Sequence, residues 1–160
     1  MFDLPNDLKI IQGLKPGSTG NTASTGDFVN CENLHYLYAI CDISRNVAST
    51  ATFNWYTASA YAGTGSSALS TGCKWYVNDG CGFDRLVQKT TSNSSYTSAS
   101  STGRLQVVSR LDCAAMPSSH SYAAFANHDQ SQATNFVHIT YVGVPRYKGV
   151  GSFLATTSST

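Results

Sequence analysis

The chain has 160 residues and a formal net charge of +1, and only 12% of its residues are charged. This length allows one domain with a substantial core and leaves little room for a second. The scarcity of charge, without any cluster of Lys and Arg, argues against a nucleic-acid binder that works by neutralising phosphates.

Ser and Thr make up thirty-nine of the residues, whereas Glu32 is the one glutamate. Amphipathic helices usually take their polar face from Glu, Lys, Gln and Arg. A hydroxyl-rich chain punctuated by thirteen glycines and mixed with β-branched and aromatic residues favours strands and turns instead. The composition therefore predicts an all-β protein with a weakly charged exterior.

Residues 1–26 are expected to form an N-terminal arm and a flexible linker. Apolar side chains within residues 4–14 suit a short helical turn or an extended arm that docks on another surface, whereas residues 16–26 (PGSTGNTASTG) are too small and polar to pack a core. The first residues carry acids where a secretion signal needs a basic region followed by an apolar run. No apolar stretch reaches the length of a membrane span, so we expect synthesis in a cytoplasm.

Strand patterns follow at short intervals in the first half of the body. Residues 27–31 alternate weakly, and the dense apolar run at 36–43 predicts a strand that is covered on both faces. In residues 51–56 the alternation places Phe53 and Trp55 on one face.

The second half continues in the same way. Residues 74–77 and 83–87 flank Asn78-Asp79-Gly80, and an Asp-Gly pair between strands indicates a hairpin turn. The clearest strand pattern is at residues 135–144. It ends at Pro145, because proline has no N–H to donate to a neighbouring strand. The remaining predicted strands are 104–108, 121–126 and 135–144.

Ser/Thr/Gly-rich loops at 63–72, 90–103 and 116–121 separate these strands, and no internal helix is indicated. Many short strands of this kind predict a single antiparallel β-sandwich or jelly-roll-like domain. We place this domain at residues 27–148, followed by a loosely ordered tail at 149–160.

The sequence shows no catalytic or cofactor-binding pattern. It lacks a Gly-x-Ser-x-Gly elbow and a glycine-rich phosphate loop, and its histidines form no HExxH motif. A Ser-His-Asp triad assembled only in space stays an alternative, but we expect a protein that is not an enzyme, without catalytic, cofactor or metal-binding residues. The four histidines are His35, His120, His128 and His138.

Five cysteines occur without CxxC spacing, so a zinc site is not expected. Buried free thiols are the first interpretation, and a disulfide between Cys73 and Cys81 is the alternative. The cysteines are Cys31, Cys41, Cys73, Cys81 and Cys113.

Aromatic residues are the remaining candidates for binding. Trp55 and Trp75 could line a carbohydrate platform together with Tyr56, Tyr61 and Tyr76. Aromatic strand faces more often belong to a sandwich core or to a subunit interface.

The order of segments resembles a group of small virion structural proteins of tailed bacteriophages, encoded near the major capsid protein. Residues 27–30 (DFVN) are similar to the family's opening strand, and residues 33–43 to its "Asn, Ala/Leu, His, aliphatic strand" segment; a strand like residues 51–57 follows. Residues 62–69 (AGTGSSAL) resemble its "GTGSKALT" loop, and residues 84–88 (DRLVQ) its "DTLVRQT" strand. An aromatic strand (residues 74–78) and an "RY" ending after the last strand (residues 135–147) complete the likeness, from which the cysteines and residues 120–132 depart.

This resemblance implies a capsid decoration (cement) protein on the outer surface of the phage head, made in the bacterial cytoplasm. Its implied partners are the major capsid protein and further copies of itself, most simply as a homotrimer, without nucleic acid or membrane. The alternatives are a tail, neck or surface-fibre component, or a carbohydrate-binding adhesion module that recognises host-surface glycans.

Overall fold

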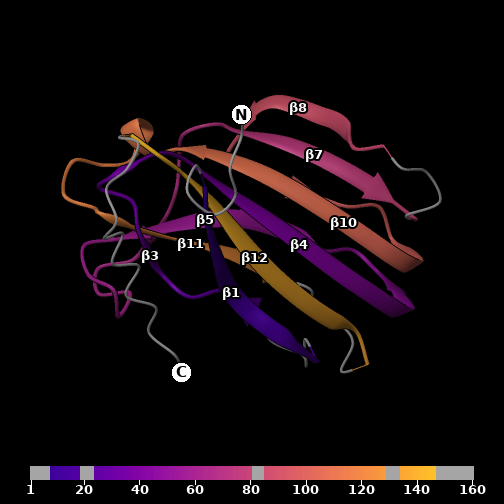
Figure 1. Ribbon diagram of the computed structural model, residues 1–160. Coiled ribbons are helices and arrows are strands. Elements are labelled where there is room, and N and C mark those ends of the chain that lie inside the picture. Colours follow the sequence, from indigo (N-terminus) through magenta and orange to yellow (C-terminus); the bar gives the residue numbers. More distant parts are fainter. Residues whose placement is uncertain (1–7, 19–23, 81–84, 129–133, 147–160) are drawn as a thin grey trace.

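A computed structural model describes residues 8–18, 24–80, 85–128 and 134–146 (Figure 1). In these ranges the chain forms two antiparallel sheets and one 3₁₀ turn, η1 (Cys113–Ala115). The strands of one sheet lie in front of those of the other in Figure 1, so the protein is the predicted β-sandwich. No helix in the described ranges has the length and hydropathy of a membrane span.

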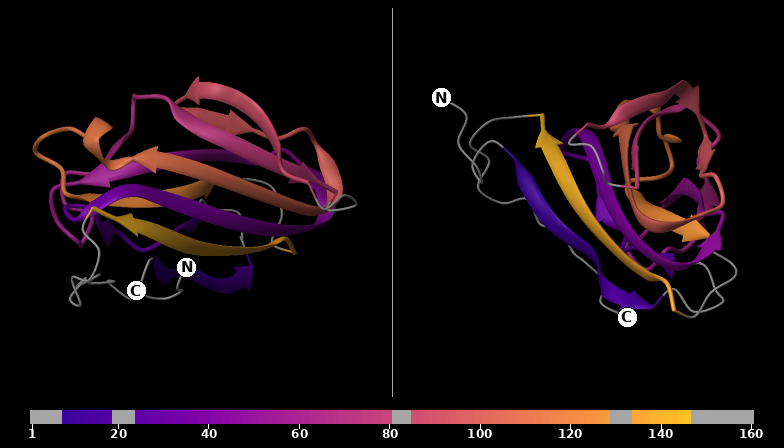
Figure 2. Two further views of the ribbon diagram at one scale, coloured as in Figure 1. Left: turned by 45° about the horizontal axis from the view of Figure 1, so that its top comes forward. Right: turned by 90° about the vertical axis from the view of Figure 1, so that its right-hand side faces the viewer.

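Sheet A has six strands and holds the two longest, which run side by side near its middle. Its edge strands are β1 and β8, and Figure 2 shows β1 beside β12 at one edge. The order is β1 (Lys9–Ser18), β12 (Phe136–Pro145), β4 (Leu34–Ser49), β10 (Ser101–Asp112), β7 (Cys73–Asp79) and β8 (Val87–Asn93).

Sheet B is built around two seven-residue strands, β11 and β5, with short strands on either side. Its members are β2 (Ser24–Thr25), β11 (Tyr122–His128), β5 (Thr52–Ala58) and β6 (Ser67–Ala68), with β3 (Val29–Asn30) also beside β11 and β9 (Ser95–Thr97) beside β5.

The core between the sheets is aromatic. Trp55 and Phe125 meet edge to face with ring centroids 5.1 Å apart, and Trp75 packs on Phe125 with centroids 5.9 Å apart. Hydrogen bonds cross between the sheets in this core: the indole N–H of Trp55 donates to Ser109 Oγ at 2.9 Å, and the backbone N–H of Phe125 donates to Tyr141 Oη at 2.8 Å. The indole of Trp55 and the phenol of Tyr141 are therefore satisfied by the opposite sheet, whereas the indole N–H of Trp75 donates to the Asn93 carbonyl within sheet A.

The N-terminal region differs from its prediction. The described part of the expected arm and linker supplies β1, which pairs with β12, and β2, which pairs with β11. Pro16 fits because β1 is an edge strand, where a missing N–H removes no ladder bond. Register shifts between Gln12 and Leu14 and between Leu14 and Gly17 absorb the residues that break the alternation. The predicted tail, residues 149–160, lies outside the described residues.

One strand prediction and one loop prediction in the middle of the chain were wrong. The strand expected at 83–87 begins only at Val87, and residues 81–84 lie outside the described ranges. The loop expected at 90–103 contains the end of β8, all of β9 and the start of β10. The antiparallel pairing of the two strands is confirmed, because β7 pairs with β8. The strands are joined by residues 80–86 and not by a two-residue Asp-Gly turn; Gly80 has a φ of +82°, and residues 81–84 lie outside the described ranges.

The expectation that residues 36–43 are covered on both faces was also wrong. Leu37, Ala39, Cys41 and Ile43 are buried, whereas the alternate side chains are only half-buried. Because a two-layer sandwich packs one face of each sheet, the other side of β4 lies on the outside of sheet A.

Candidate interaction surface

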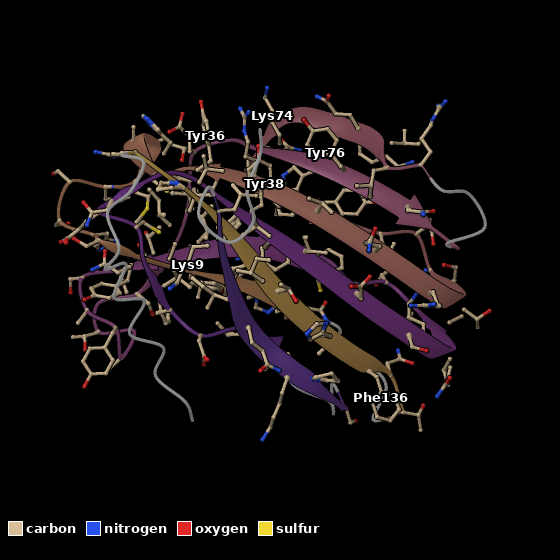
Figure 3. The ribbon with its side chains drawn as sticks, in the orientation of Figure 1. Lys9, Tyr36, Tyr38, Lys74, Tyr76 and Phe136 are labelled. Atoms are coloured by element: carbon tan, nitrogen blue, oxygen red, sulfur yellow. The ribbon has the colours of Figure 1, made fainter. Side chains whose placement is uncertain are left out.

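The outer face of sheet A consists of the side chains that alternate with the core residues and point away from sheet B. Figure 3 shows Tyr36, Tyr38, Lys74 and Tyr76 together on this side, with Phe136 near its far end. The outer face comprises Tyr36, Tyr38, Ile40, Asp42 and Ser44 on β4; Arg104, Gln106, Val108, Arg110 and Asp112 on β10; Lys74, Tyr76 and Asn78 on β7; and Phe136, His138, Thr140, Val142 and Val144 on β12.

An apolar row crosses the middle of this face. Ile40 lies opposite Val108 on one side and Thr140 on the other, and Val108 lies opposite Tyr76. Directly opposite side chains in antiparallel strands are in contact distance of one another. The four strands therefore present a continuous, weakly polar band to the outside.

Two cations stand beside this band. Arg110 and Lys74 lie directly opposite each other on β10 and β7, and like charges in that position are destabilising. The guanidinium of Arg110 lies 4.6 Å from the centroid of the Tyr36 ring, a cation–π contact that holds the side chain against the face. In the part of the chain that the structure describes, the ion pair is Arg45–Asp79, and neither Arg110 nor Lys74 has one.

The acids of the outer face are held by hydrogen bonds. The Gln106 side-chain amide donates to Asp42 Oδ1 at 2.9 Å, and Asp112 accepts from the backbone N–H of Ala114 at 3.1 Å. Near Arg104 the surface is hollowed by a cavity of about 120 Å³. The outer face therefore carries both cations and acids and has a hollow near Arg104.

The two tryptophans belong to the sandwich core, the favoured interpretation, and do not form the alternative carbohydrate platform. Trp55 and Trp75 are fully buried, and their indole N–H groups donate to Ser109 and to the backbone carbonyl of Asn93. Strand alternation in the segment KWYV sends Trp75 inward and Tyr76 outward, so the tyrosines carry the exposed aromatic surface. The alternation of the sequence shows that Trp75 and Tyr76 lie on opposite faces of the strand, but it does not show which of the two faces is buried.

Three of the four histidines, His120, His128 and His138, lie within hydrogen-bonding distance of hydroxyl groups. His120 Nδ1 lies 2.8 Å from Thr57 Oγ1, and His128 Nε2 and His138 Nε2 lie 3.4 Å from Tyr56 Oη and Thr140 Oγ1. A catalytic triad also needs an acid that orients the imidazole, and none of the hydrogen bonds found within the described ranges joins a histidine to a carboxylate. Asp129, next to His128 in sequence, lies outside those ranges.

The cysteines that the structure describes are buried free thiols: Cys31, Cys41, Cys73 and Cys113. Cys73 is therefore not paired with Cys81, which lies outside the described residues. Burial raises the pKa of Cys73 to about 12, and burial also raises that of Cys41 far above its ordinary value. A hydrogen bond with Cys113, followed by burial, raises the pKa of Cys31. Thiols in this state are poor nucleophiles, and within the described ranges no three His, Cys, Asp or Glu side chains are placed to hold a metal ion.

A second hollow lies along the β7–β8 hairpin. It has a volume of about 400 Å³, and Asn78, Asp79, Arg85 and Lys89 supply its polar groups. Asp79 is already engaged, because Arg45 Nη2 donates to its carboxylate at 2.8 Å. The remaining charged groups of this hollow are Arg85 and Lys89, which are both exposed. Two exposed cations alone do not indicate which ligand would bind there.

No protein-family model and no curated protein matches the chain. Among solved structures, the SPBc2 prophage-derived protein YomS is 14% identical with a TM-score of 0.46, over 86% of this chain and 92% of that one. TmCBM61 in complex with β-1,4-galactotriose is 10% identical with a TM-score of 0.26, over 87% and 83% of the two chains. The structure of Desmodium yellow mottle tymovirus is 9% identical with a TM-score of 0.17, over 94% of this chain and 95% of that one. A functional assignment therefore depends on the surface and on the sequence resemblance.

Proposed function

We propose that this chain is a structural protein of a tailed-phage virion, a capsid decoration protein that binds the outside of the head shell and stabilises it. The observation that carries the proposal is a stiff two-sheet scaffold with one broad aromatic and aliphatic face, the outer face of sheet A, which suits a subunit of a larger assembly. The ordered resemblance of residues 27–148 to virion proteins encoded beside the major capsid protein supports the same role.

Physical chemistry favours assembly over catalysis for such a molecule. Aromatic residues and Arg are the side chains enriched at protein interfaces, and Tyr36, Tyr38, Tyr76 and Arg110 all stand on the outer face. A net charge of +1 leaves little long-range repulsion between copies. On a symmetric shell, many modest contacts of this kind add up to firm attachment.

The resemblance implies a homotrimer, whereas the arrangement of the outer face favours pairing by two. The major capsid protein is the proposed shell partner. A place in the tail, neck or a surface fibre is the competing assignment, and the same experiment separates the two.

The test is binding of the purified chain to isolated heads and isolated tails of a phage whose genome encodes it. We expect saturable binding to mature, expanded heads, a stoichiometry set by the shell lattice, and a higher temperature of head disruption after binding. Unexpanded heads are the matched control, since their lattice spacing differs. Binding to tails alone would support the competing assignment, and binding to neither particle would remove the proposal.

A further inference from the structure

We propose that the outer face of sheet A packs on the same face of a second copy, about a two-fold axis that passes Val108 and runs across the strands. The inference rests on the proposed function and deepens it, because it assigns this face to contact between copies and leaves the shell contact to other surfaces. Figure 3 is viewed onto this face.

The argument begins with the outward residues of β10. In order they are Arg104, Gln106, Val108, Arg110 and Asp112. A two-fold axis across the strands places β10 of one copy on β10 of the other, running in the opposite direction. The residue two positions before Val108 in one copy then meets the residue two positions after Val108 in the other, and the same holds at four positions. Val108 then meets itself, and Arg104 meets Asp112.

Both members of that pair are exposed in the single chain. Each lies four residues from Val108, which corresponds to about 13 Å along a strand. The two-fold axis generates the pair twice, once at each end of the contact. A cation and an acid placed symmetrically about an apolar centre are therefore self-complementary, which is the requirement for an isologous interface.

The neighbouring strands agree with this arrangement. On β4, Ile40 meets itself and Tyr38 faces Asp42, so a phenol can donate to a carboxylate. Gln106, which faces Arg110, already holds the Asp42 carboxylate at 2.9 Å. The unpaired positive charge of Arg110 is thus brought close to an acid of the second copy. This offsets the repulsion from Lys74 within one chain.

The other simple way to pair two sheets, an axis parallel to the strands, is much less favourable. It would place β10 on β4, so that Arg104 would face Ser44 and Asp112 would face Tyr36, according to the register within the sheet. Both charges would lose water without gaining a partner of opposite charge, which is costly. Charge complementarity therefore selects the axis across the strands.

Surface relief supports the same choice. The hollow of about 120 Å³ lies beside Arg104, where Pro16, Phe136 and His138 also line it. At the opposite end of β10, Asp112 begins the short η1 turn, whose Ala114 and Ala115 are exposed. The two-fold axis brings this turn of one copy over the hollow of the other.

The first experiment is sedimentation of the full chain from low micromolar to submillimolar concentration. We expect a species of about twice 17.1 kDa whose dissociation is promoted by salt. Val108→Asp should abolish it, because two carboxylates would meet on the axis. The matched control is Val47→Asp at an exposed valine of β4 outside the outer face, which should leave the dimer unchanged.

The second experiment reverses charges at the ends of the contact. Arg104→Asp and Asp112→Arg should each weaken self-association by about tenfold or more, since each removes two ion pairs and places like charges together. The double variant should restore it. Asp112→Arg also removes the hydrogen bond to Ala114, but the double variant shares that loss, so restoration reports the pairing alone. Circular dichroism checks that each variant is folded.

A monomer at all concentrations would overturn the inference, as would a dimer or trimer that tolerates Val108→Asp, or a double variant that stays dissociated. These outcomes are separate from those for the proposed function. A monomeric chain that still binds heads contradicts only the two-fold pairing, and a charge-sensitive dimer that binds no particle contradicts only the virion role.

Discussion

The hydroxyl of Tyr141 is a single atom whose removal tests how the two sheets are held together. Tyr141 lies on β12 of sheet A and is fully buried, and its Oη accepts a hydrogen bond from the backbone N–H of Phe125 on β11 of sheet B. β11 pairs with β2 on one side of Phe125 and with β3 on the other. The N–H of Phe125 therefore falls between two short ladders, and the phenol takes the place of a ladder bond.

Tyr141→Phe keeps the ring and removes this acceptor. A buried N–H left without a partner costs about 1–3 kcal/mol, while the packing of the ring against Trp55, with centroids 6.1 Å apart, is retained. We expect the free energy of unfolding to fall by about 2 kcal/mol. For a chain of this size that corresponds to a Tm lower by about 4–8 °C.

Urea unfolding followed by tryptophan fluorescence measures this change, because Trp55 and Trp75 are buried in the folded protein. All variants are compared at one protein concentration, since self-association would add to apparent stability. Tyr61→Phe is the control, because Tyr61 is 52% exposed. If Tyr141→Phe cost no more than Tyr61→Phe, the hydrogen bond between the sheets would contribute nothing measurable, and our account of the core would be wrong.

Three further variants test other parts of the fold. Gly13→Ala should destabilise by about 1–3 kcal/mol, because its Cβ would overlap the Tyr141 ring, whereas Gly17→Ala, with no atom nearer than 3.8 Å, should have little effect on urea unfolding. Arg45→Met should cost about 1–3 kcal/mol, since it leaves the part-buried Ala99 carbonyl without its donor, whereas Asp79, 38% exposed, can be hydrated; an unchanged urea midpoint would contradict this. Cys73 keeps its proton in the folded chain up to about pH 12, whereas in the unfolded chain it ionises near 9. Its contribution to stability is therefore lost as pH rises above 9, at about 1.4 kcal/mol per pH unit, and Cys73→Ala should show a pH slope smaller by that amount in urea unfolding between pH 9.5 and 11.

Strand positions were predictable where alternation is strong. In residues 51–56 and 135–144 a period of two separated the two faces of each strand, and the structure shows that the face with Phe53 and Trp55 and the face with Val137 and Ile139 are the buried ones. Such positions are determined by local sequence, because a slip of one residue would turn every apolar side chain outward.

Other strands could not be predicted because their sequence is that of a linker. β1 contains Gly13 and Pro16, which normally indicate turns, yet the glycine is required by the Tyr141 ring packed against it and the proline is tolerated at a sheet edge. The Ser/Thr-rich strands β8 and β9 lack apolar periodicity and exist through pairing with β7 and β5. In each case the cause is a tertiary contact that is distant in sequence.

The outer face of sheet A was hidden from sequence for a different reason. The apolar run at 36–43 is equally compatible with a strand between two layers and with a strand that has one free apolar face, and only the two-layer architecture decides between them. In the two-layer architecture, the residues on the two sides of β10 have different roles. Leu105, Val107, Ser109 and Leu111 are buried against sheet B. The alternate residues have no comparable packing role within one chain, and Arg110 opposite Lys74 opposes folding of the single chain by a few tenths of a kcal/mol or more. This charge repulsion lies beside a half-buried apolar band, and a contact with a second surface would compensate for both.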